Sequence, residues 1–371
     1  MTKFDCIFYM TSKIAFFFGS DASPPINVLY ENLSDLISDH FEIDFVGFYK
    51  TEKFGKKVNE YIYDFPSEKG LKRMLYSCET LKNYLEKNEP DLIVLAQKHG
   101  VYALPVLLSA NLNKTIIRLN IDIFNFYKDE LYENRINRFK SYLINNLLSK
   151  ITLNKALGVI VQTDYMYEQC ERKGIDSEKL SVIPLPINED RFKKVTKKEK
   201  NKFRNQLDIG KDENIALIVG SKSTRKRHHF LDQLLTNTHN LKDIQFIIIG
   251  RTDYGKKLSQ KYSNVRYEGY VNHDELPKYY QAGDFLLHFA KIEGFPTVFQ
   301  EANACGLPII AKRANYNETL DICKYDDLEE LEEMLKNKIW RKIETNVTSG
   351  LSKQEYINYF ERMIEKAEKN K

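Results

Sequence analysis

The chain has 371 residues, of which 42% are apolar and 29% charged, with a formal net charge of +4. This length predicts two domains with apolar cores, and so mild a charge gives no argument for nucleic acid as a partner. The five cysteines are scattered without a C-x-x-C pair, which argues against zinc ribbons and dithiol redox motifs and favours a reducing, cytoplasmic setting. Because no run of about 18 apolar residues occurs and the N-terminus lacks a signal-peptide layout, no membrane-spanning helix or leader is expected.

Short apolar runs alternate with amphipathic stretches in the first half of the chain. Continuous runs of Ile, Leu, Val and Phe are typical of strands buried on both faces of a parallel sheet. The runs predict strands at 4–10, 41–49, 91–96, 115–121 and 157–163, and the amphipathic stretches predict helices at 26–40 and 69–87. The basic, amphipathic segment 135–150 predicts a helix that either packs on the core or rests on a membrane surface.

A segment with two prolines and a basic run, KLSVIPLPINEDRFKKVTKKEKNKFR (179–204), separates two copies of this pattern. The prolines place the domain boundary near Pro184–Pro186, and the run at 191–204 predicts a solvated face or a second membrane-binding surface. We therefore expect an N-terminal domain over 1–183, a C-terminal domain over 184–350, and a helix over 351–371 that packs back toward the N-terminal domain.

The second half of the chain repeats the alternation of strands and helices. The apolar runs predict strands at 214–220, 244–250, 264–270, 284–290 and 307–312, and the amphipathic stretches predict helices at 226–235 and 274–282. No strand is expected after about residue 320, where 326–343 and 352–369 read as helices. Strands that alternate with helices in this way predict doubly wound α/β domains.

The stretch KIEGFPTVFQEANACGLPIIAKR (291–313) combines a strand end, a turn and a helix. Ligands in open α/β sheets bind beyond the carboxyl ends of the strands, and free N–H groups at a helix N-terminus attract anions. Glu293 lies just before the N-terminus of this helix, and Glu301 points back toward that N-terminus from within the helix. The two carboxylates can therefore contact one extended ligand with hydroxyl groups, such as a ribose diol. A capping glutamate followed by a solvated one would give the same spacing.

The segment EGFPTVFQEANACGLPIIA resembles the E-x7-E signature of the retaining family 4 glycosyltransferases, which have the GT-B fold. The segments SVIPLPINEDRF and IQFIIIGRTDYGKKLSQKYSNVRYEGYVNHDELPKYYQAGDFLLHFA also resemble this family and occur in the expected order, although Leu185-Pro186 replaces the usual Asn-Gly. The resemblance implies an α/β fold of two doubly wound Rossmann-like domains that face a cleft, with a nucleotide-diphosphate sugar on the C-terminal domain.

The resemblance also implies the roles of residues on the donor side. Glu293 and the amides that follow it would hold the sugar, Glu301 the ribose, and the loop after Gly269 the base. The expected donor-binding residues are Gly220, Tyr270, Val271, Gly294, Phe295, Pro296, Thr297 and Glu301.

A basic cluster, SKSTRKRHH (221–229), follows the first strand of the C-terminal half. The family has an Arg and a Lys here that grip the diphosphate; Lys226 matches the Lys, but Ser221 stands where the Arg is expected. Arg225 or Lys222 is expected to supply that charge, so the predicted catalytic residues are Glu293, Lys226 and Arg225. A solvated basic surface is the alternative interpretation.

On the acceptor side, candidates lie at strand ends of the N-terminal half. Gly19 lets the backbone approach a ligand, and His99, Asn120 and Asp122 follow predicted strands. A surface histidine and a strand end satisfied within the protein are the alternatives. No metal and no cofactor are expected, because cationic side chains hold the diphosphate in this fold and no cluster has metal-ligand spacing.

The sequence thus predicts a hexosyltransferase that acts with retention of configuration in glycan or glycolipid biosynthesis. It would be either free in the cytoplasm or peripheral at the inner face of the membrane. Its partners would be a nucleotide-sugar donor and a glycan, lipid-linked or protein acceptor, without nucleic acid. The alternatives are an epimerase or phosphorylase of the same fold, or a nucleotide-sugar-binding partner without catalysis.

Overall fold

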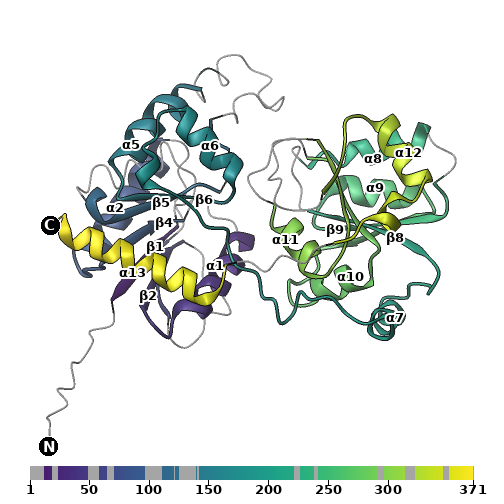
Figure 1. The fold of residues 1–371 in the computed structure, drawn as a ribbon, viewed down its shortest axis with the longest axis horizontal. Coiled ribbons are helices and arrows are strands. Elements are labelled where there is room, and N and C mark those ends of the chain that lie inside the picture. The colour runs from purple at the N-terminus through teal and green to yellow at the C-terminus, as the bar shows by residue number, and fades with distance from the viewer. Residues whose placement is uncertain are drawn as a thin grey trace, which may run out of the picture. The chain divides into compact units, whose positions relative to one another are not determined.

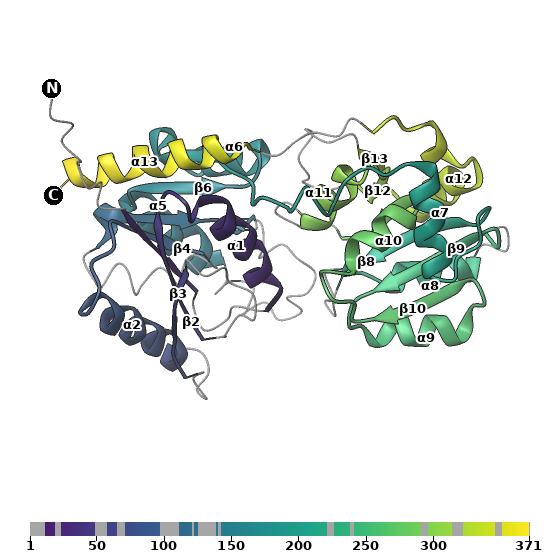
Figure 2. The same ribbon diagram turned by 90° about the horizontal axis from the view of Figure 1, so that it is seen from below.

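The computed structural model describes residues 12–18, 24–48, 58–64, 71–96, 111–120, 122–124, 139, 142–220, 226–237, 241–290, 296–313, 322–345 and 351–370. The chain divides into two compact units (Figures 1 and 2). The first unit contains the described residues up to Pro186 together with those from Leu351 onward, and the second contains those from Ile187 to residue 345.

The first unit is built on a parallel sheet of seven strands in the order β3-β2-β1-β4-β5-β6-β7. Its strands are β1 Lys13–Phe17, β2 Glu42–Gly47, β3 Val58–Ile62, β4 Leu92–Leu95, β5 Thr115–Arg118, β6 Gly158–Val161 and β7 Leu180–Val182. Its helices are α1 Pro24–Ile37, α2 Leu71–Leu85, α5 Ser149–Lys155, which continues a π-helical turn Ile144–Leu148, α6 Asp164–Arg172 and α13 Lys353–Lys369.

Helices cover both faces of this sheet because successive strand residues point to opposite sides. Ile14 and Phe16 of β1 pack with α1 and α13, whereas Ala15 and Phe17 pack with α2, α5 and α6. In Figure 2, α1 and α13 lie on the near side of the sheet. The apolar strands therefore read as continuous runs, because each of them is buried on both faces.

The second unit repeats the design with a parallel sheet of six strands in the order β10-β9-β8-β11-β12-β13. Its strands are β8 Asn214–Val219, β9 Ile244–Ile249, β10 Val265–Gly269, β11 Phe285–His288, β12 Ile309–Lys312 and β13 Ile322–Tyr325. Its helices are α7 Lys197–Gln206, α8 His229–Asn237, α9 Asp253–Lys261, α10 Leu276–Ala282, α11 Thr297–Ala304 and α12 Leu328–Lys336. Helices α10 and α11 cover one face, and α8, α9 and α12 cover the other (Figure 1).

Both sheets reverse their direction of winding at one place. In the first unit β1 lies between β2 and β4, and in the second β8 lies between β9 and β11. The crevice beyond the carboxyl ends of the strands at such a reversal is the usual ligand site of doubly wound sheets.

The predicted doubly wound α/β architecture is confirmed, but several elements differ from the sequence predictions. The strand β1 (Lys13–Phe17) was not predicted, although it is a central strand of the first sheet. The expected end of strands near residue 320 is wrong, because β13 follows. The strand predicted at 4–10 lies outside the described residues.

Three strands were missed for a common physical reason. β3 and β7 are the two edges of the first sheet, and β13 is an edge of the second. An edge strand has one neighbour and exposed side chains, as in VNEYI of β3, so it lacks the continuous apolar run of a central strand. Its sequence therefore reads as loop.

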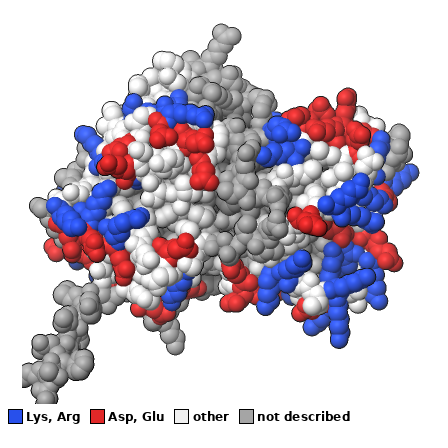
Figure 3. Space-filling model, viewed as in Figure 1, with Lys and Arg blue, Asp and Glu red and all other residues white. Residues whose placement is uncertain are grey.

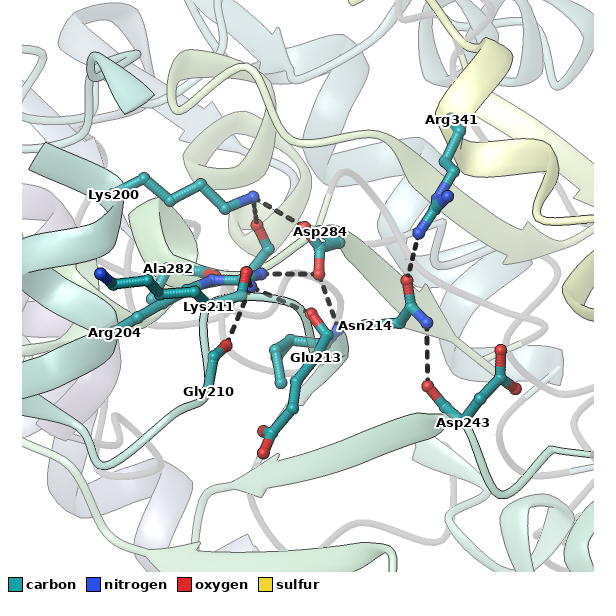
Figure 4. Close-up of polar contacts among 12 residues, drawn as sticks. Lys200, Arg204, Gly210, Lys211, Glu213, Asn214, Asp243, Ala282, Asp284 and Arg341 are labelled. Carbon is teal, nitrogen blue, oxygen red and sulfur yellow. Dashed lines mark hydrogen bonds and ion pairs between the residues drawn. The ribbon is translucent and has the colours of Figure 1, made fainter. Parts of the chain in front are cut away.

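The basic run 191–204 is only partly the solvated face that its composition predicts. Lysine side chains gather over α7, as Figure 3 shows, and a capping box of Thr196 and Glu199 begins this helix. Arg204, however, is only 3% exposed. All three guanidinium nitrogens of Arg204 donate hydrogen bonds, to Asp284 and to the carbonyl oxygens of Gly210, Lys211, Glu213 and Ala282 (Figure 4). This side chain therefore ties α7 to the amino-terminal edge of the second sheet.

The chain leaves the first unit along a segment that buried side chains hold in place. Arg118 Nη2 donates to the carbonyl of Ile183 over 2.8 Å, and the Tyr356 hydroxyl of α13 donates to that of Pro184 over 2.6 Å. Because α13 also packs on α1 in the main core, the end of the chain fixes the point of departure.

Candidate functional site

Lys226 lies at the winding reversal of the second sheet, where β8 ends beside β11. Gly220 follows β8, and a Cβ placed on it would lie 3.3 Å from three carbons of the Lys226 side chain. The lysine stem therefore runs across the end of the strand, and a side chain at position 220 would displace it. Two of the residues predicted from sequence, Gly220 and Lys226, are thus brought together.

Two buried histidines share this end of the sheet. Burial and, to a smaller extent, the nearby positive charges of Lys226 and His229 together lower the pKa of His228 to about 4. His288, the last residue of β11, has its pKa lowered well below the usual range by burial and then by Lys226 and His228. Both imidazoles are therefore neutral at physiological pH, and Lys226 supplies the positive charge.

Helix α11 begins just beyond β11 and directs its N-terminus toward the same edge of the sheet. Pro296 is its N-cap residue and Thr297 its first helical residue, and no side chain of the N-cap satisfies the first N–H groups. The helix ends at Ala304, and Gly306, the residue after the C-cap, has a φ of 68°, the left-handed conformation typical of a helix C-terminus. Glu293, Gly294 and Phe295 of the preceding turn lie outside the described residues, as do Arg225 and Lys222.

Glu301, on the second turn of α11, is buried with only 4% of its surface exposed. Its Oε2 accepts a hydrogen bond from the Tyr280 hydroxyl over 2.7 Å, and its Oε1 lies 3.2 Å from Nε2 of His273. Burial, followed by the negative charge of Glu301, raises the pKa of Tyr280 well above its usual value, so the hydroxyl remains a donor. The sequence analysis found Glu301 but neither partner, which lie 21 and 28 residues away.

The loop after β10 contains two further predicted residues. Tyr270 is 65% exposed, and the Arg251 guanidinium lies 4.8 Å from its ring centroid. Val271 packs against the core that α10 and α11 cover. Tyr270 and Arg251 together offer a flat, cationic surface at the ends of β9 and β10, and such a surface can stack on a planar ring. Arg251 lies in a segment that resembles the family, but it was given no role because its contact with Tyr270 joins the ends of two different strands.

Two of the four acceptor-side candidates fall within the described residues of the first unit. Asn120 Nδ2 donates to the carbonyl of Ala96 over 2.9 Å, and Gln162 donates to the Asn120 carbonyl. Asp122 is buried and accepts a hydrogen bond from the Tyr165 hydroxyl. Gly19 and His99 lie outside the described residues.

Within the described ranges, no group of three or more His, Cys, Asp or Glu side chains could hold a metal ion. No described helix is both long and apolar enough to cross a bilayer. The chemistry at the second unit is that of an anion site: an ammonium group, a helix N-terminus and a carboxylate with remaining acceptor capacity stand at one sheet edge.

Solved structures define the class of fold. Over 95% of this chain and 99% of the other, the structure is similar to Anabaena HepE in complex with UDP and glucose, with a TM-score of 0.70 and 16% identity. The predicted fold class, two Rossmann-like domains of the GT-B type, is confirmed.

Sequence comparisons match two family models. The model described as Glycosyltransferase Family 4 matches residues 27–191, and that described as Glycosyl transferases group 1 matches residues 199–324. Together with the fold, these two matches support a glycosyltransferase family 4-like protein.

Two curated relatives have named activities. The chain is 24% identical over 169 residues to an alpha-galactosylglucosyldiacylglycerol synthase of Streptococcus pneumoniae, which covers 43% of this chain and 44% of that protein. It is 25% identical over 313 residues to an alpha-monoglucosyldiacylglycerol synthase of Acholeplasma laidlawii, which covers 79% of this chain and 76% of that protein. The chain spans less than half the length of two other curated relatives, 45% of one and 44% of the other. The same holds for the Streptococcus pneumoniae protein.

Proposed function

We propose that this protein is a glycosyltransferase that moves a glycosyl group from a nucleotide-diphosphate sugar to a hydroxyl of a glycolipid or glycan acceptor. The observation that carries the proposal is the position of Lys226 across Gly220, at the winding reversal and beside the strand that leads into α11. An ammonium group and a helix N-terminus at one sheet edge suit a diphosphate. The two glycolipid synthases among the relatives favour a lipid-linked acceptor.

The proposed reaction proceeds with retention of configuration. The bond between the anomeric carbon and the diphosphate breaks, the acceptor oxygen bonds to the same face of that carbon, and a leaving-group oxygen takes the acceptor proton. Lys226 stabilises the negative charge that builds on the leaving phosphate, and Arg225 is proposed to assist it. Glu293 is proposed to hold the sugar hydroxyls rather than to act as a nucleophile. Neither a metal ion nor a pyridoxal group is required in this scheme.

Donor binding is proposed to extend along the ends of β8, β9 and β10. The α11 N-terminus, with Thr297 as its first helical residue, would face the phosphates. Glu301 would accept hydrogen bonds from the ribose diol, because each carboxylate oxygen can accept more than the one bond it has here. The base would lie near Tyr270 and Arg251. On the first unit, Asn120 and Asp122 remain proposed acceptor-side residues.

A nucleotide-sugar panel tests the proposal. Wild-type protein is incubated with each donor, with and without diacylglycerol or glycosyl-diacylglycerol, and release of the nucleoside diphosphate is measured. The account predicts acceptor-dependent release and a product with the donor's anomeric configuration by NMR. Release of a free epimerised sugar without acceptor would favour an epimerase, and a requirement for pyridoxal phosphate a phosphorylase. Absence of turnover with every donor, despite binding, would favour a non-catalytic partner.

We further propose that the first unit docks on an anionic membrane surface through the helix that ends with α5. Large apolar side chains on this segment face solvent: Phe139 is 61% exposed, Leu147 56% and Ile151 50%. Exposed Lys150 and Lys155 lie beside them. Apolar side chains flanked by lysines suit the boundary between lipid headgroups and acyl chains.

Vesicle sedimentation tests this docking surface. Leu147→Asp and Ile151→Asp should each weaken binding to vesicles of anionic phospholipid by roughly tenfold, since burial of one leucine or isoleucine side chain is worth about 1.5–3 kcal/mol. Leu75→Asp is the matched control, because Leu75 is a 50% exposed leucine on α2 of the same unit. Equal losses in all three variants would contradict this surface.

A further inference from the structure

The Glu301 carboxylate is held in one orientation from two sides. Tyr280 of α10 donates to Oε2 over 2.7 Å, and His273, in the turn before α10, meets Oε1 over 3.2 Å. A carboxylate accepts hydrogen bonds only, so Nε2 of His273 carries the hydrogen in this contact. The side chain of Glu301 is 5% exposed and that of His273 23%, which leaves one side of the pair open to solvent.

The two residues that hold Glu301 are themselves held by the segment that follows Pro186. The Phe192 ring lies 5.3 Å from the His273 ring and 5.8 Å from the Tyr280 ring, centroid to centroid. Arg191 Nη2 forms an ion pair of 2.8 Å with Asp274, the residue after His273.

The backbone of the same segment is fixed to α10. The side-chain amide of Gln281, next to Tyr280, donates to the Arg191 carbonyl over 2.9 Å and to the Lys193 carbonyl over 3.3 Å. These contacts join residues that are 88 and 90 positions apart in sequence.

We propose that His273 and Tyr280 are positioning residues for Glu301 and that Arg191 and Phe192 hold these two residues in place. The segment that follows Pro186 would thereby set the affinity for the nucleotide. This inference rests on the proposed function, because it takes Glu301 as the acceptor of the ribose hydroxyls. Neither His273 nor Tyr280 needs to touch the ligand: each uses one acceptor position of one oxygen and leaves the other positions for a vicinal diol.

The physical reason is preorganisation. A free glutamate side chain loses rotamer entropy when it is fixed, and burial of a carboxylate without hydrogen bonds is unfavourable. In this protein the orientation of the Glu301 carboxylate is set before a ligand binds, so binding of the nucleotide-sugar does not include that loss of entropy. Removal of either hydrogen bond should therefore weaken nucleotide binding and raise the KM for the donor, while kcat changes little, since Glu301 is remote from the reacting bond in the proposed scheme.

Binding of UDP, GDP and ADP, measured by isothermal titration calorimetry together with donor KM and kcat, tests the inference. Tyr280→Phe and His273→Ala should each weaken binding of the preferred nucleotide about tenfold and raise KM by a similar factor, with kcat within about threefold of wild type. His273→Gln, whose amide nitrogen can reach the position of Nε2, should restore most of the affinity. Arg191→Ala, which touches neither Glu301 nor the proposed ligand, should weaken binding about threefold.

The matched control is Tyr262→Phe, which also removes a tyrosine hydroxyl bonded to a carboxylate in the second unit, that of Asp232 over 2.8 Å. It should bind nucleotide as wild type does. If Glu301→Gln weakens binding while Tyr280→Phe and His273→Ala bind as wild type, the positioning role is overturned although the proposed function stands. If wild-type protein binds none of the three nucleotides and turns over no donor, the proposed function fails and this inference fails with it. Melting temperatures identify any variant that loses binding through unfolding.

Discussion

At the amino-terminal edge of the second sheet, Arg204 and Asp284 form an ion pair with each other. At the carboxyl-terminal edge, Lys226 follows β8 and Glu301 lies on α11. Asp284 accepts from Lys200, from Arg204 and from the amide of Ile215, each over 2.7 Å, so the charges are neutralised inside the fold (Figure 4). At the other edge, Glu301 has one protein partner on each oxygen and can accept more.

This comparison shows that residue type alone does not distinguish a charged side chain that stabilises the fold from one that is proposed to bind a ligand. The runs around 200 and 226 are both rich in Lys and Arg, and composition would assign them the same role. What distinguishes Arg204 is that Asp284 and four backbone carbonyls accept hydrogen bonds from its guanidinium. The two edges should therefore respond oppositely to mutation: one through stability, the other through binding and turnover.

The largest effect is expected for Lys226→Ala. Loss of one preorganised positive group that faces a leaving phosphate should lower kcat about 100- to 1,000-fold, as it does for comparable electrostatic groups. The urea midpoint should remain near the wild-type value. Lys202→Ala, an exposed lysine of α7, serves as the control in the same initial-rate assay, and an equal loss of rate in this control would contradict the assignment.

Arg204→Ala should destabilise the second unit at the amino-terminal edge of its sheet. Removal of the buried guanidinium takes one of three donors from Asp284 and leaves several backbone carbonyls without the hydrogen bond that Arg204 gives them, so the free energy of unfolding of the second unit should fall by about 3 kcal/mol. Urea denaturation, followed by a probe in the second unit such as Trp340, measures this change. Nucleotide affinity, measured where the variant is still folded, should match the wild type; a parallel loss of affinity would show that the two edges are not separate.

Acid should destabilise the second unit through the histidines of the carboxyl-terminal edge. Burial lowers the pKa of His228 to about 4, whereas an unfolded histidine has a pKa near 6.5. Above about pH 6.5 the imidazole is neutral in both states and contributes nothing to pH dependence. Between about pH 6.5 and 4 the unfolded chain binds the extra proton, so stability should fall with a slope of up to about 1.4 kcal/mol per pH unit.

Urea titrations between pH 7 and 4.5 measure this slope. His228→Asn should reduce it, because His288 is then the remaining one of the two buried histidines that take up a proton on unfolding. Lys226→Ala should also reduce the slope, because Lys226 contributes to the lowering of the pKa of His228. An unchanged slope in both variants would contradict the electrostatic arrangement at this edge.

The smallest effect is expected at the start of α7. The Thr196 hydroxyl accepts from the Glu199 amide, and the Glu199 carboxylate accepts from the Thr196 amide. Thr196→Ala should therefore cost about 1 kcal/mol of unfolding free energy, which is typical of a lost N-cap, without any change in nucleotide affinity. A loss as large as that of Arg204→Ala would mean that α7 as a whole, rather than the Arg204 pair, stabilises this edge.

The sequence predicts the doubly wound fold and the central strands other than β1, because strands buried on two faces leave continuous apolar runs. It does not predict the edge strands β3, β7 and β13, whose half-exposed residues carry no such signal. At the site, local order places Lys226 after β8 and Glu301 within α11. It gives no sign that His273 and Tyr280 contact Glu301, or that Arg191 pairs with Asp274 beside them. These contacts join residues up to 83 positions apart and depend on how α10, α11 and the segment after Pro186 pack.

Equilibrium titration of UDP, GDP and ADP into wild type, Lys226→Ala and Lys202→Ala tests the central claim most directly. The account predicts that at least one nucleotide binds to wild type and to Lys202→Ala with the same affinity, and at least tenfold more weakly to Lys226→Ala. Equal affinity in all three proteins, or no binding to the wild type, would contradict a diphosphate site at the carboxyl end of β8.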